Sequence, residues 1–246
     1  MSGHSKWATI KHAKGAADAK RGQMFTKLIK EISIAARMAG GSLDGNPRLR
    51  TAILKARAAN MPKDNIDRAI KKGTGELEGV NYEELIYEAY AAGGVAVFIE
   101  VLTDNKNRAA ADIRNILTRA GGQLATSGSV SRLFKRQGVI TLDGEKYTED
   151  DIMEVAIEGG AEDVSAQDGI IEVTSAPEDF ESVLNALQAK EFETMSAEIS
   201  MVAEAEVTLD NDGTAKALKL IDKLEENDDV QNVYTNLAIP EGYVAQ

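Results

Sequence analysis

The sequence lacks cysteine altogether and contains only two histidines and four prolines among its 246 residues. The absence of cysteine excludes disulfides, thiol catalysis and cysteine-based zinc sites, and it fits a reducing compartment. No apolar run approaches the roughly 18 residues that a membrane-spanning helix needs. Residues 1–7 are polar and lack the apolar stretch of a secretory signal. We therefore expect a cytoplasmic protein without a membrane partner, with cores built from the 43% of residues that are apolar.

Acidic residues are scarce in the first part of the chain, and basic residues are the minority in the rest. Residues 1–75 carry 16 Lys and Arg against 5 Asp and Glu, whereas residues 76–246 carry 12 basic and 35 acidic residues. The formal net charge of −12 therefore averages a basic segment and a strongly acidic one. A compact basic segment is typical of proteins that bind a polyanion, which would repel the acidic remainder. We expect the chain to touch nucleic acid at its basic end only.

Three amphipathic helices are predicted within the basic segment. Apolar residues recur at helical spacing across residues 17–39. Asn46 and Pro47 supply the cap and first turn of a second helix, and Pro62 opens a third that Gly73 closes. A solvated surface is one interpretation of their polar faces, but solvated faces normally mix both signs of charge. The basic residues assigned to the outer faces are Lys20, Lys27, Lys30, Arg37, Arg48, Arg50, Lys55 and Arg57.

Residues 1–16 combine cations with the only tryptophan of the chain and have no periodic apolar stripe. Trp7 has two equally weighted interpretations: it stacks on an unpaired base, or it anchors this arm on the first helix. Two histidines without cysteines or nearby carboxylates do not make a metal site, so we expect them to bind phosphate or base. The candidate binding residues of the arm are His4, Lys6, Trp7, Lys11, His12 and Lys14.

The acidic remainder alternates strand and helix patterns. Across residues 136–204 the order is β-α-β-β-α-β, the split pattern of ferredoxin-like domains, with a hairpin at Asp168-Gly169. The flanking elements are strands at 84–90, 95–102 and 130–134, helices at 106–119 and 214–225, and a strand at 230–235. We therefore predict an α+β protein with three domains. These are a basic helical domain at 1–78, a discontinuous α/β domain at 79–135 and 205–246, and an α/β domain at 136–204 inserted in it.

Motifs of known enzyme chemistry are missing from the sequence. It has neither a G-x-x-x-x-G-K-[ST] phosphate loop nor a G-x-G-x-x-G turn after a strand. Residues 210–213 superficially suggest a calcium loop, but Ile221 occupies the closing position, so we expect a turn and helix cap. We predict no enzyme activity, no cofactor and no metal. One candidate phosphate site, with an ordinary capped helix as the alternative, is the helix start formed by Asn105, Lys106, Asn107 and Arg108.

Specific runs distributed over the whole chain carry a family resemblance. They are Ser2-Gly3-His4-Ser5-Lys6-Trp7, Asp18-Ala19-Lys20-Arg21-Gly22, Asn46-Pro47-Arg48-Leu49-Arg50, Asp104-Asn105-Lys106-Asn107-Arg108, Gly160-Ala161-Glu162-Asp163-Val164, Leu220-Ile221-Asp222 and Asp228-Asp229-Val230-Gln231. With these runs the chain resembles the YebC family. The resemblance implies three domains around a cleft, the first of them all-helical.

The same resemblance implies a role in gene expression. Members are widely described as DNA-binding transcriptional regulators, mitochondrial relatives as translational activators, and bacterial members as ribosome-associated factors that relieve stalling at proline-rich stretches. By this resemblance, residues 3–7 would reach toward RNA at the catalytic centre of the ribosome. The start of the chain at this motif favours the bacterial, cytoplasmic form.

We predict a non-enzymatic protein that grips the phosphate backbone of nucleic acid. Lys and Arg dominate the predicted helices and carry little sequence information, and no recognition helix for base edges stands out. These features favour ribosomal RNA or tRNA, with the ribosome as partner, whereas a DNA-binding transcriptional regulator is the alternative. The acidic surface is expected to bind basic proteins, and a monomer is favoured. The candidate binding residues of the helices are Lys20, Arg21, Lys27, Lys30, Arg48, Arg50 and Arg57.

Overall fold

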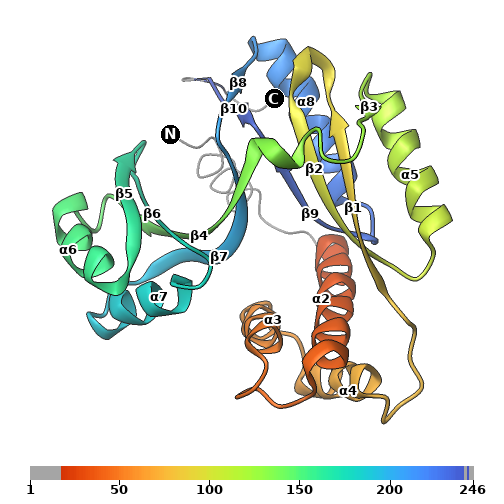
Figure 1. The fold of residues 1–246 in the computed structure, drawn as a ribbon, viewed down its shortest axis with the longest axis horizontal. Coiled ribbons are helices and arrows are strands. Elements are labelled where there is room, and N and C mark those ends of the chain that lie inside the picture. Colours follow the sequence, from red (N-terminus) through yellow and green to blue (C-terminus); the bar gives the residue numbers. More distant parts are fainter. Residues whose placement is uncertain (1–17, 241–242, 244–246) are drawn as a thin grey trace.

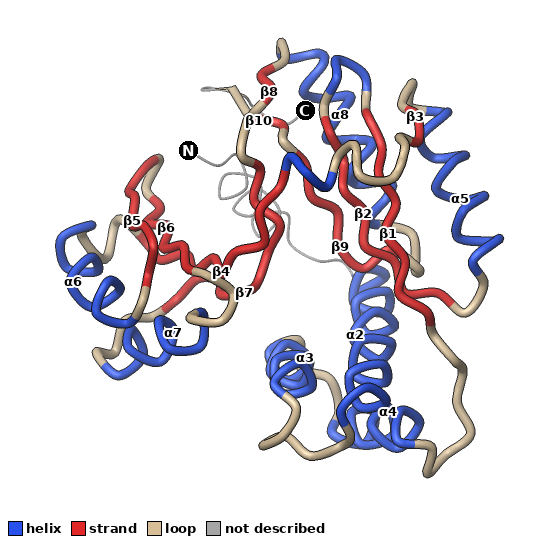
Figure 2. The backbone as a smooth tube through the Cα atoms, viewed as in Figure 1, coloured by secondary structure: helices blue, strands red, loops and turns tan. Residues whose placement is uncertain are grey.

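Three helices open the part of the chain that this computed structural model describes, residues 18–240 and 243 (Figure 1). They are α2 (Asp18–Ala39), α3 (Pro47–Ala58) and α4 (Lys63–Thr74). Ile32, Leu49 and Ile66, one from each helix, meet in a shared apolar core. We call residues 18–74 the helical unit, and Figure 2 shows that it contains helices and loops without a strand. The predicted three-helix arrangement is confirmed.

Asn46 joins the end of α2 to the start of α3. Its side-chain oxygen accepts a hydrogen bond from the backbone N–H of Leu49 (3.0 Å), which caps α3 as predicted. Its amide nitrogen donates to the carbonyl oxygens of Ala35 and Gly40, each at 2.8 Å. Asn46 is only 1% exposed, so the cap is also an internal brace between two helices.

Gly73 does not end α4, contrary to the prediction. The helix continues to Thr74, and Gly75 follows it in the left-handed conformation with φ at 83°. Gly73 lies where α4 crosses α2: a Cβ built on it would lie 2.3 Å from the carbonyl oxygen of Ser33 and 2.7 Å from Cβ of Ala36. The residue is therefore a glycine because two helices approach closely there, which periodicity alone does not reveal.

An antiparallel sheet with strand order β3-β1-β2-β9 forms the middle unit. Its elements are β1 (Glu83–Tyr90), β2 (Ala96–Thr103), α5 (Lys106–Arg119), β3 (Gln123–Leu124), α8 (Asn211–Glu225) and β9 (Val230–Thr235). Both helices pack on one face of the sheet, where Ile113 and Leu220 meet Val97 and Ile99. Phe98 points to a second apolar cluster on the opposite face, so β2 is buried on both sides. Its continuous apolar sequence follows from this double burial.

The inserted unit has the predicted β-α-β-β-α-β order. Its elements are β4 (Phe134–Asp143), α6 (Glu149–Gly159), β5 (Ala161–Gln167), β6 (Ile170–Ser175), α7 (Phe180–Ala189) and β7 (Thr194–Ala203). The strands are antiparallel in the order β5-β6-β4-β7, and α6 and α7 share one core with the sheet. Asp168 and Gly169 both have positive φ and form the predicted turn between β5 and β6.

A paired ribbon and an apolar cluster join the inserted unit to the middle unit. β4 and β7 pair from Phe134 opposite Ala203 onward. The segment that enters the inserted unit and the segment that leaves it are therefore hydrogen-bonded to each other. The Phe98 ring lies 6.1 Å from the Phe134 ring and 6.2 Å from the Tyr234 ring, measured between centroids. Apolar burial therefore fixes this joint.

Residues 130–134, predicted as a strand, form a turn instead. Ser131–Leu133 is a short 3-10 helix, and β4 begins only at Phe134. The carboxylate of Glu88, which is 6% exposed, holds this segment curled. It accepts hydrogen bonds from three backbone N–H groups, those of Gly128, Val130 and Ser131. In a strand these groups would serve a neighbouring strand.

The α+β fold, with a helical region followed by two sheet-containing units, is confirmed. The domain boundaries at residues 78, 135 and 204 stay a prediction, which the separate apolar cores support. Two short strands, β8 (Val207–Thr208) and β10 (Leu237–Ala238), pair in parallel near the end of the chain. Within the described residues, no helix combines the length and apolarity needed to cross a membrane.

Candidate nucleic-acid interface

Lys30 is buried, which corrects its predicted place on an outer helix face. It is 7% exposed, and its ammonium group donates to Oδ1 of Asp229 at 2.7 Å. The same group donates to the carbonyl oxygens of Asp228 (2.8 Å) and Leu102 (3.3 Å). All three acceptors belong to the middle unit, which therefore covers this side of α2. A lysine enclosed by protein acceptors has no access to phosphate in this structure.

Asp229 is the centre of the contact between the helical and middle units. It is 4% exposed, and its Oδ2 accepts hydrogen bonds from Nη2 (2.8 Å) and Nε (3.2 Å) of Arg108. Burial alone would raise the pKa of this carboxyl, but the hydrogen bonds from Lys30 and Arg108 bring the pKa below its ordinary value. The hydrogen bonds from Arg108 to Asp229 likewise raise the pKa of the guanidinium. The contact between Asp229 and Arg108 thus favours the charged forms of both groups.

The predicted phosphate site at the start of α5 has its cations already paired. Asn105 caps the helix by accepting a hydrogen bond from the backbone N–H of Arg108 at 3.0 Å. Lys106 pairs with Glu83 at 2.6 Å, and Arg108 pairs with Asp104 at 2.6 Å. Asn105 caps the helix as the alternative expects, and both cations have carboxylate partners, so the phosphate site stays a prediction. We leave Asn105, Lys106, Asn107 and Arg108 out of the interface.

Residues 210–213 form the predicted turn and helix cap. Asp210 precedes α8, and its Oδ1 accepts a hydrogen bond from the backbone N–H of Gly213 at 2.7 Å. This is the ordinary use of an aspartate at a helix start.

Two more candidate cations face other parts of the protein. The ammonium group of Lys27 donates to the carbonyl oxygen of Glu225 at 2.6 Å. Arg48 pairs with Glu31 at 2.6 Å and also with Glu84 of β1. Burial would lower the pKa of Arg48, but the hydrogen bonds that its guanidinium donates to Glu31 and Glu84 raise the pKa. Both side chains connect the helical unit to the middle unit, and Arg48 is still 35% exposed.

Arg50 and Lys55 of α3 pair with carboxylates of the inserted unit. Nη2 of Arg50 lies 2.9 Å from Glu181 in α7, and Nζ of Lys55 lies 3.1 Å from Glu198 in β7. The four side chains are between 35% and 54% exposed, so water and salt reach both pairs. These cations are accessible but engaged.

The cations left without such partners lie mainly on α4. Arg21, whose guanidinium lies over the Phe25 ring at 5.5 Å, and Arg57 are the described candidates that form no ion pair in this structure. Within residues 21–75, four further exposed basic residues make no ion pair. They are Lys63, Arg68, Lys71 and Lys72. We call Arg57 and these four residues the free basic face.

The sequence contained a signal for this face. Arg68 and Lys71 are one turn apart in a helix whose inner side carries Ile66 and Ala69, so both cations point outward. None of Lys63, Arg68, Lys71 and Lys72 was among the residues predicted to bind nucleic acid. Asp64 and Asp67 on the same helix reduce its net charge to +2.

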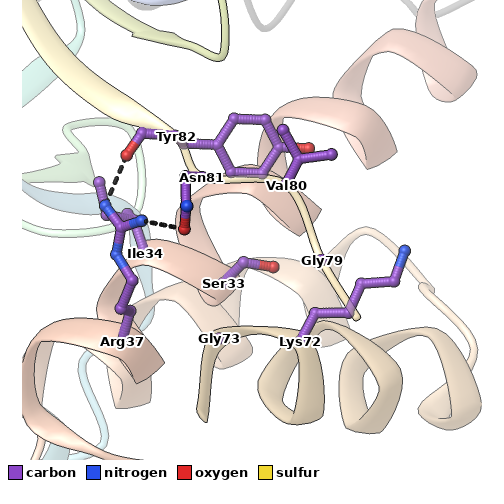
Figure 3. A pocket seen from close by; sticks show the side chains of 9 residues that line it. All are labelled: Ser33, Ile34, Arg37, Lys72, Gly73, Gly79, Val80, Asn81 and Tyr82. Atoms are coloured by element: carbon purple, nitrogen blue, oxygen red, sulfur yellow. Dashed lines mark hydrogen bonds between the residues drawn. The ribbon is translucent and has the colours of Figure 1, made fainter. Parts of the chain in front are cut away.

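A small cavity lies behind this face, between α2, α4 and residues 79–82 (Figure 3). Its volume is about 30 Å³, which holds about one water molecule and excludes a nucleotide. Arg37 closes one side by donating to Oδ1 of Asn81 (2.9 Å) and to the carbonyl oxygen of Tyr82 (2.6 Å). Figure 3 shows Lys72 extending away from Arg37. The cavity is therefore part of the packing, and the interface is the outer surface.

Several candidate residues lie outside what the structure describes. Residues 1–17 are not described, and nothing is shown of the side chain of Lys20. The two interpretations of Trp7 both stay predictions. The undescribed arm candidates are His4, Lys6, Trp7, Lys11, His12 and Lys14.

Comparison with protein families finds two matches that together span most of the chain. Residues 5–76 match the family model described as TACO1/YebC protein N-terminal domain. Residues 82–237 match the model described as TACO1/YebC second and third domain. The division between the two models falls in the segment that links the helical unit to β1.

Similar proteins come from several bacteria. A protein of Treponema denticola is 68% identical over 243 residues, which cover 99% of this chain and 98% of the relative. One from Syntrophobacter fumaroxidans is 55% identical over 98% of this chain and 97% of the relative. Both are named "Probable transcriptional regulatory protein". A crystal structure of a conserved hypothetical protein from Aquifex aeolicus is 45% identical, with a TM-score of 0.83 over 93% of this chain and 95% of that one.

Proposed function

The chain belongs to the TACO1/YebC family, and from this premise we propose that it regulates gene expression by binding nucleic acid through the free basic face. The observation that carries the proposal is the selective exposure of Arg57, Lys63, Arg68, Lys71 and Lys72 in a protein whose net charge is −12. Most other cations of the helical unit face carboxylates or carbonyls of the same chain. A face kept free of partners is available to phosphates.

The chemistry of this face favours backbone contacts over sequence recognition. Lysine and arginine on a short helix bind phosphate oxygens, which every nucleic acid presents. Asn65 lies one turn from Arg68 in α4, but the five residues of the face itself are all lysine or arginine. We therefore propose RNA of the translation machinery as the ligand, with the ribosome as the site of action. Residues 1–16 would add three lysines and Trp7 to this contact.

A DNA-binding transcriptional regulator is the second candidate. The name shared by the Treponema and Syntrophobacter relatives favours it. Duplex DNA carries a denser line of phosphates than a single strand, so the same cations would bind it with a steeper dependence on salt. The two candidates therefore differ in ligand but share the interface.

Substitution of Lys71→Gln and Lys72→Gln tests the interface. Fluorescence anisotropy with a single-stranded RNA and a duplex DNA of equal length should show weaker binding to both, because two phosphate contacts are lost. The slope of log affinity against log salt should become shallower by about 1.4 for the single strand, or about 0.7 for each lost contact. Lys190→Gln with Lys219→Gln, which removes two exposed lysines from the acidic units, is the matched control.

Equal loss in the control and the test variant would contradict the assignment of the interface. The two candidate functions are distinguished by sedimentation of a cell lysate in a sucrose gradient at low and high salt. Translation predicts that the wild-type chain moves with ribosomal particles at low salt and that the Lys71/Lys72 variant does so less. Transcription predicts that it stays at the top of the gradient and binds promoter DNA.

A further inference from the structure

The helical unit is attached to the rest of the protein by polar contacts. Its apolar cluster draws only on side chains of residues 25–70, and no cluster among the described residues combines it with another unit. The middle and inserted units, by contrast, share the cluster around Phe98 and Phe134. The orientation of the helical unit therefore depends on charge and hydrogen bonding, which salt and competing ions can change.

One part of this attachment is shielded from solvent. Lys30 and Asp229 are 2.7 Å apart and almost fully buried, and the ammonium group also lies 5.6 Å from the centre of the Tyr82 ring. Tyr82 itself belongs to the chain segment that leads from the helical unit into β1. A buried pair is screened by salt much less than an exposed one. This contact is suited to be a fixed point between the two units.

A second part, which joins the helical unit to the inserted unit, lies at the surface. Arg50–Glu181 and Lys55–Glu198 link α3 to α7 and β7, and all four side chains are at least 35% exposed. Exposed pairs of this kind are weak and lose most of their attraction at high salt. Glu181 and Glu198 also present to α3 the same kind of group that a nucleic-acid backbone would present, an anionic oxygen. A phosphate and these carboxylates therefore compete for Arg50 and Lys55.

We infer that the two ion pairs of α3 form a latch that a polyanion opens. Phosphates of a bound strand replace Glu181 and Glu198 on Arg50 and Lys55, and α3 separates from the inserted unit while Lys30–Asp229 keeps α2 on the middle unit. Arg57 of the free basic face lies on α3 together with Arg50 and Lys55, so a strand bound to Arg57 reaches the helix that carries both pairs, and the inference rests on the proposed function. Nucleic-acid binding and the distance between α3 and α7 are then coupled.

The absence of cysteine allows this distance to be measured with few changes. Thr51→Cys on α3 and Asn185→Cys on α7 are exposed positions for a pair of spin labels. Pulsed double electron–electron resonance gives the distribution of distances between them. Asn185→Cys with Lys219→Cys on α8 is the control pair, because it spans the apolar joint and should give an unchanged distance.

Three conditions are compared with the chain at low salt. They are an increase from about 50 mM to about 500 mM NaCl, which shortens the Debye length severalfold; addition of poly(U) RNA at low salt; and the substitutions Glu181→Gln with Glu198→Gln. Each should add a longer distance between α3 and α7, and the double substitution should also increase the affinity for poly(U) severalfold. Circular dichroism checks that the variants keep their helix content.

The outcomes distinguish the latch from the proposed function. If poly(U) binds in an anisotropy assay but none of the three conditions changes the distance, the latch is overturned and the proposed function stands. If salt and substitution lengthen the distance but poly(U) does not bind, the proposed function fails and with it the polyanion trigger. Lengthening under all three conditions, with an unchanged control pair, supports the inference.

Discussion

At the scale of single residues, burial decides which lysines of a basic helix are available. Lys27 and Lys30 lie on the same helix as the exposed Arg21 and Arg37. Lys30 nevertheless contacts an aspartate 199 residues further along the chain. Helical periodicity assigns polar residues to solvent, because it contains no information on a partner unit that packs against that side. The capping residues Asn46, Asn105 and Asp210 were predictable, since their partners lie three residues away.

Lys30→Met should destabilise the protein by about 3 kcal/mol, the cost of leaving a buried charge without its close partner. Methionine keeps most of the apolar stem, so the loss reports mainly the charge. The midpoint of urea unfolding, followed by circular dichroism, measures it. Lys71→Met on the exposed side of α4 should change stability by less than about 0.5 kcal/mol.

A second variant shows whether charge is the cause. In Lys30→Met with Asp229→Asn, the carboxylate that lost its ammonium partner is removed as well, so part of the lost stability should return. If the double variant is instead less stable than Lys30→Met alone, the hydrogen bonds that Asp229 accepts from Arg108 stabilise the protein by more than the loss of the ammonium partner costs.

At the scale of elements, local patterns predicted most helices and strands. The helix at 106–119 and the strand at 230–235 have the predicted bounds, because the apolar spacing lies within each element and the cap and glycines of the helix lie directly beside it. The segment at 130–134 was not predictable in the same way. Its conformation depends on Glu88, which is some 40 residues earlier and reaches it only in the folded protein.

The crossing of α2 and α4 gives a test with a built-in control. Gly73→Ala places a methyl group against the backbone of Ser33 and should destabilise the protein by about 1–3 kcal/mol through overpacking, despite the better helix propensity of alanine. Gly22→Ala in α2 meets no atom within 4 Å and should be neutral or stabilising by up to about 1 kcal/mol. Thermal unfolding followed by circular dichroism compares the two; equal effects would exclude the crossing as the cause.

At the scale of the whole molecule, the division of charge along the sequence has two consequences. It leaves one basic face free, and it also supplies the ion pairs by which the helical unit binds the acidic units. The charge pattern predicted a basic surface but placed it mainly on other residues, with only Arg57 in common. It did not predict the ion pairs within the chain, because the same count of charges fits attraction to a ligand and attraction within the chain. The apolar residues could not distinguish attraction to a ligand from attraction within the chain either, since each unit has its own apolar core.

The acidic inserted unit should weaken nucleic-acid binding from a distance. Residues 136–204 carry 18 Asp and Glu against 3 Lys and Arg, and this field repels a polyanion approaching the basic face. Neutralising Asp150, Glu154 and Glu158 on the outer side of α6 removes three charges that form no ion pair in this structure. The affinity for single-stranded RNA should rise about twofold at about 0.01 M salt, where the Debye length is about 30 Å.

The same comparison at higher salt identifies the cause. At about 0.1 M salt the Debye length falls to about 10 Å, so wild type and variant should bind RNA with nearly equal affinity. An increase that persists at this salt would show that α6 contacts the strand directly, and no increase at either salt would show that the acidic field does not reach it. Anisotropy titrations of both proteins at the two salt concentrations decide between these results. The expected outcome would mean that the acidic units orient the protein on its ligand, by making every approach except that of the basic face unfavourable.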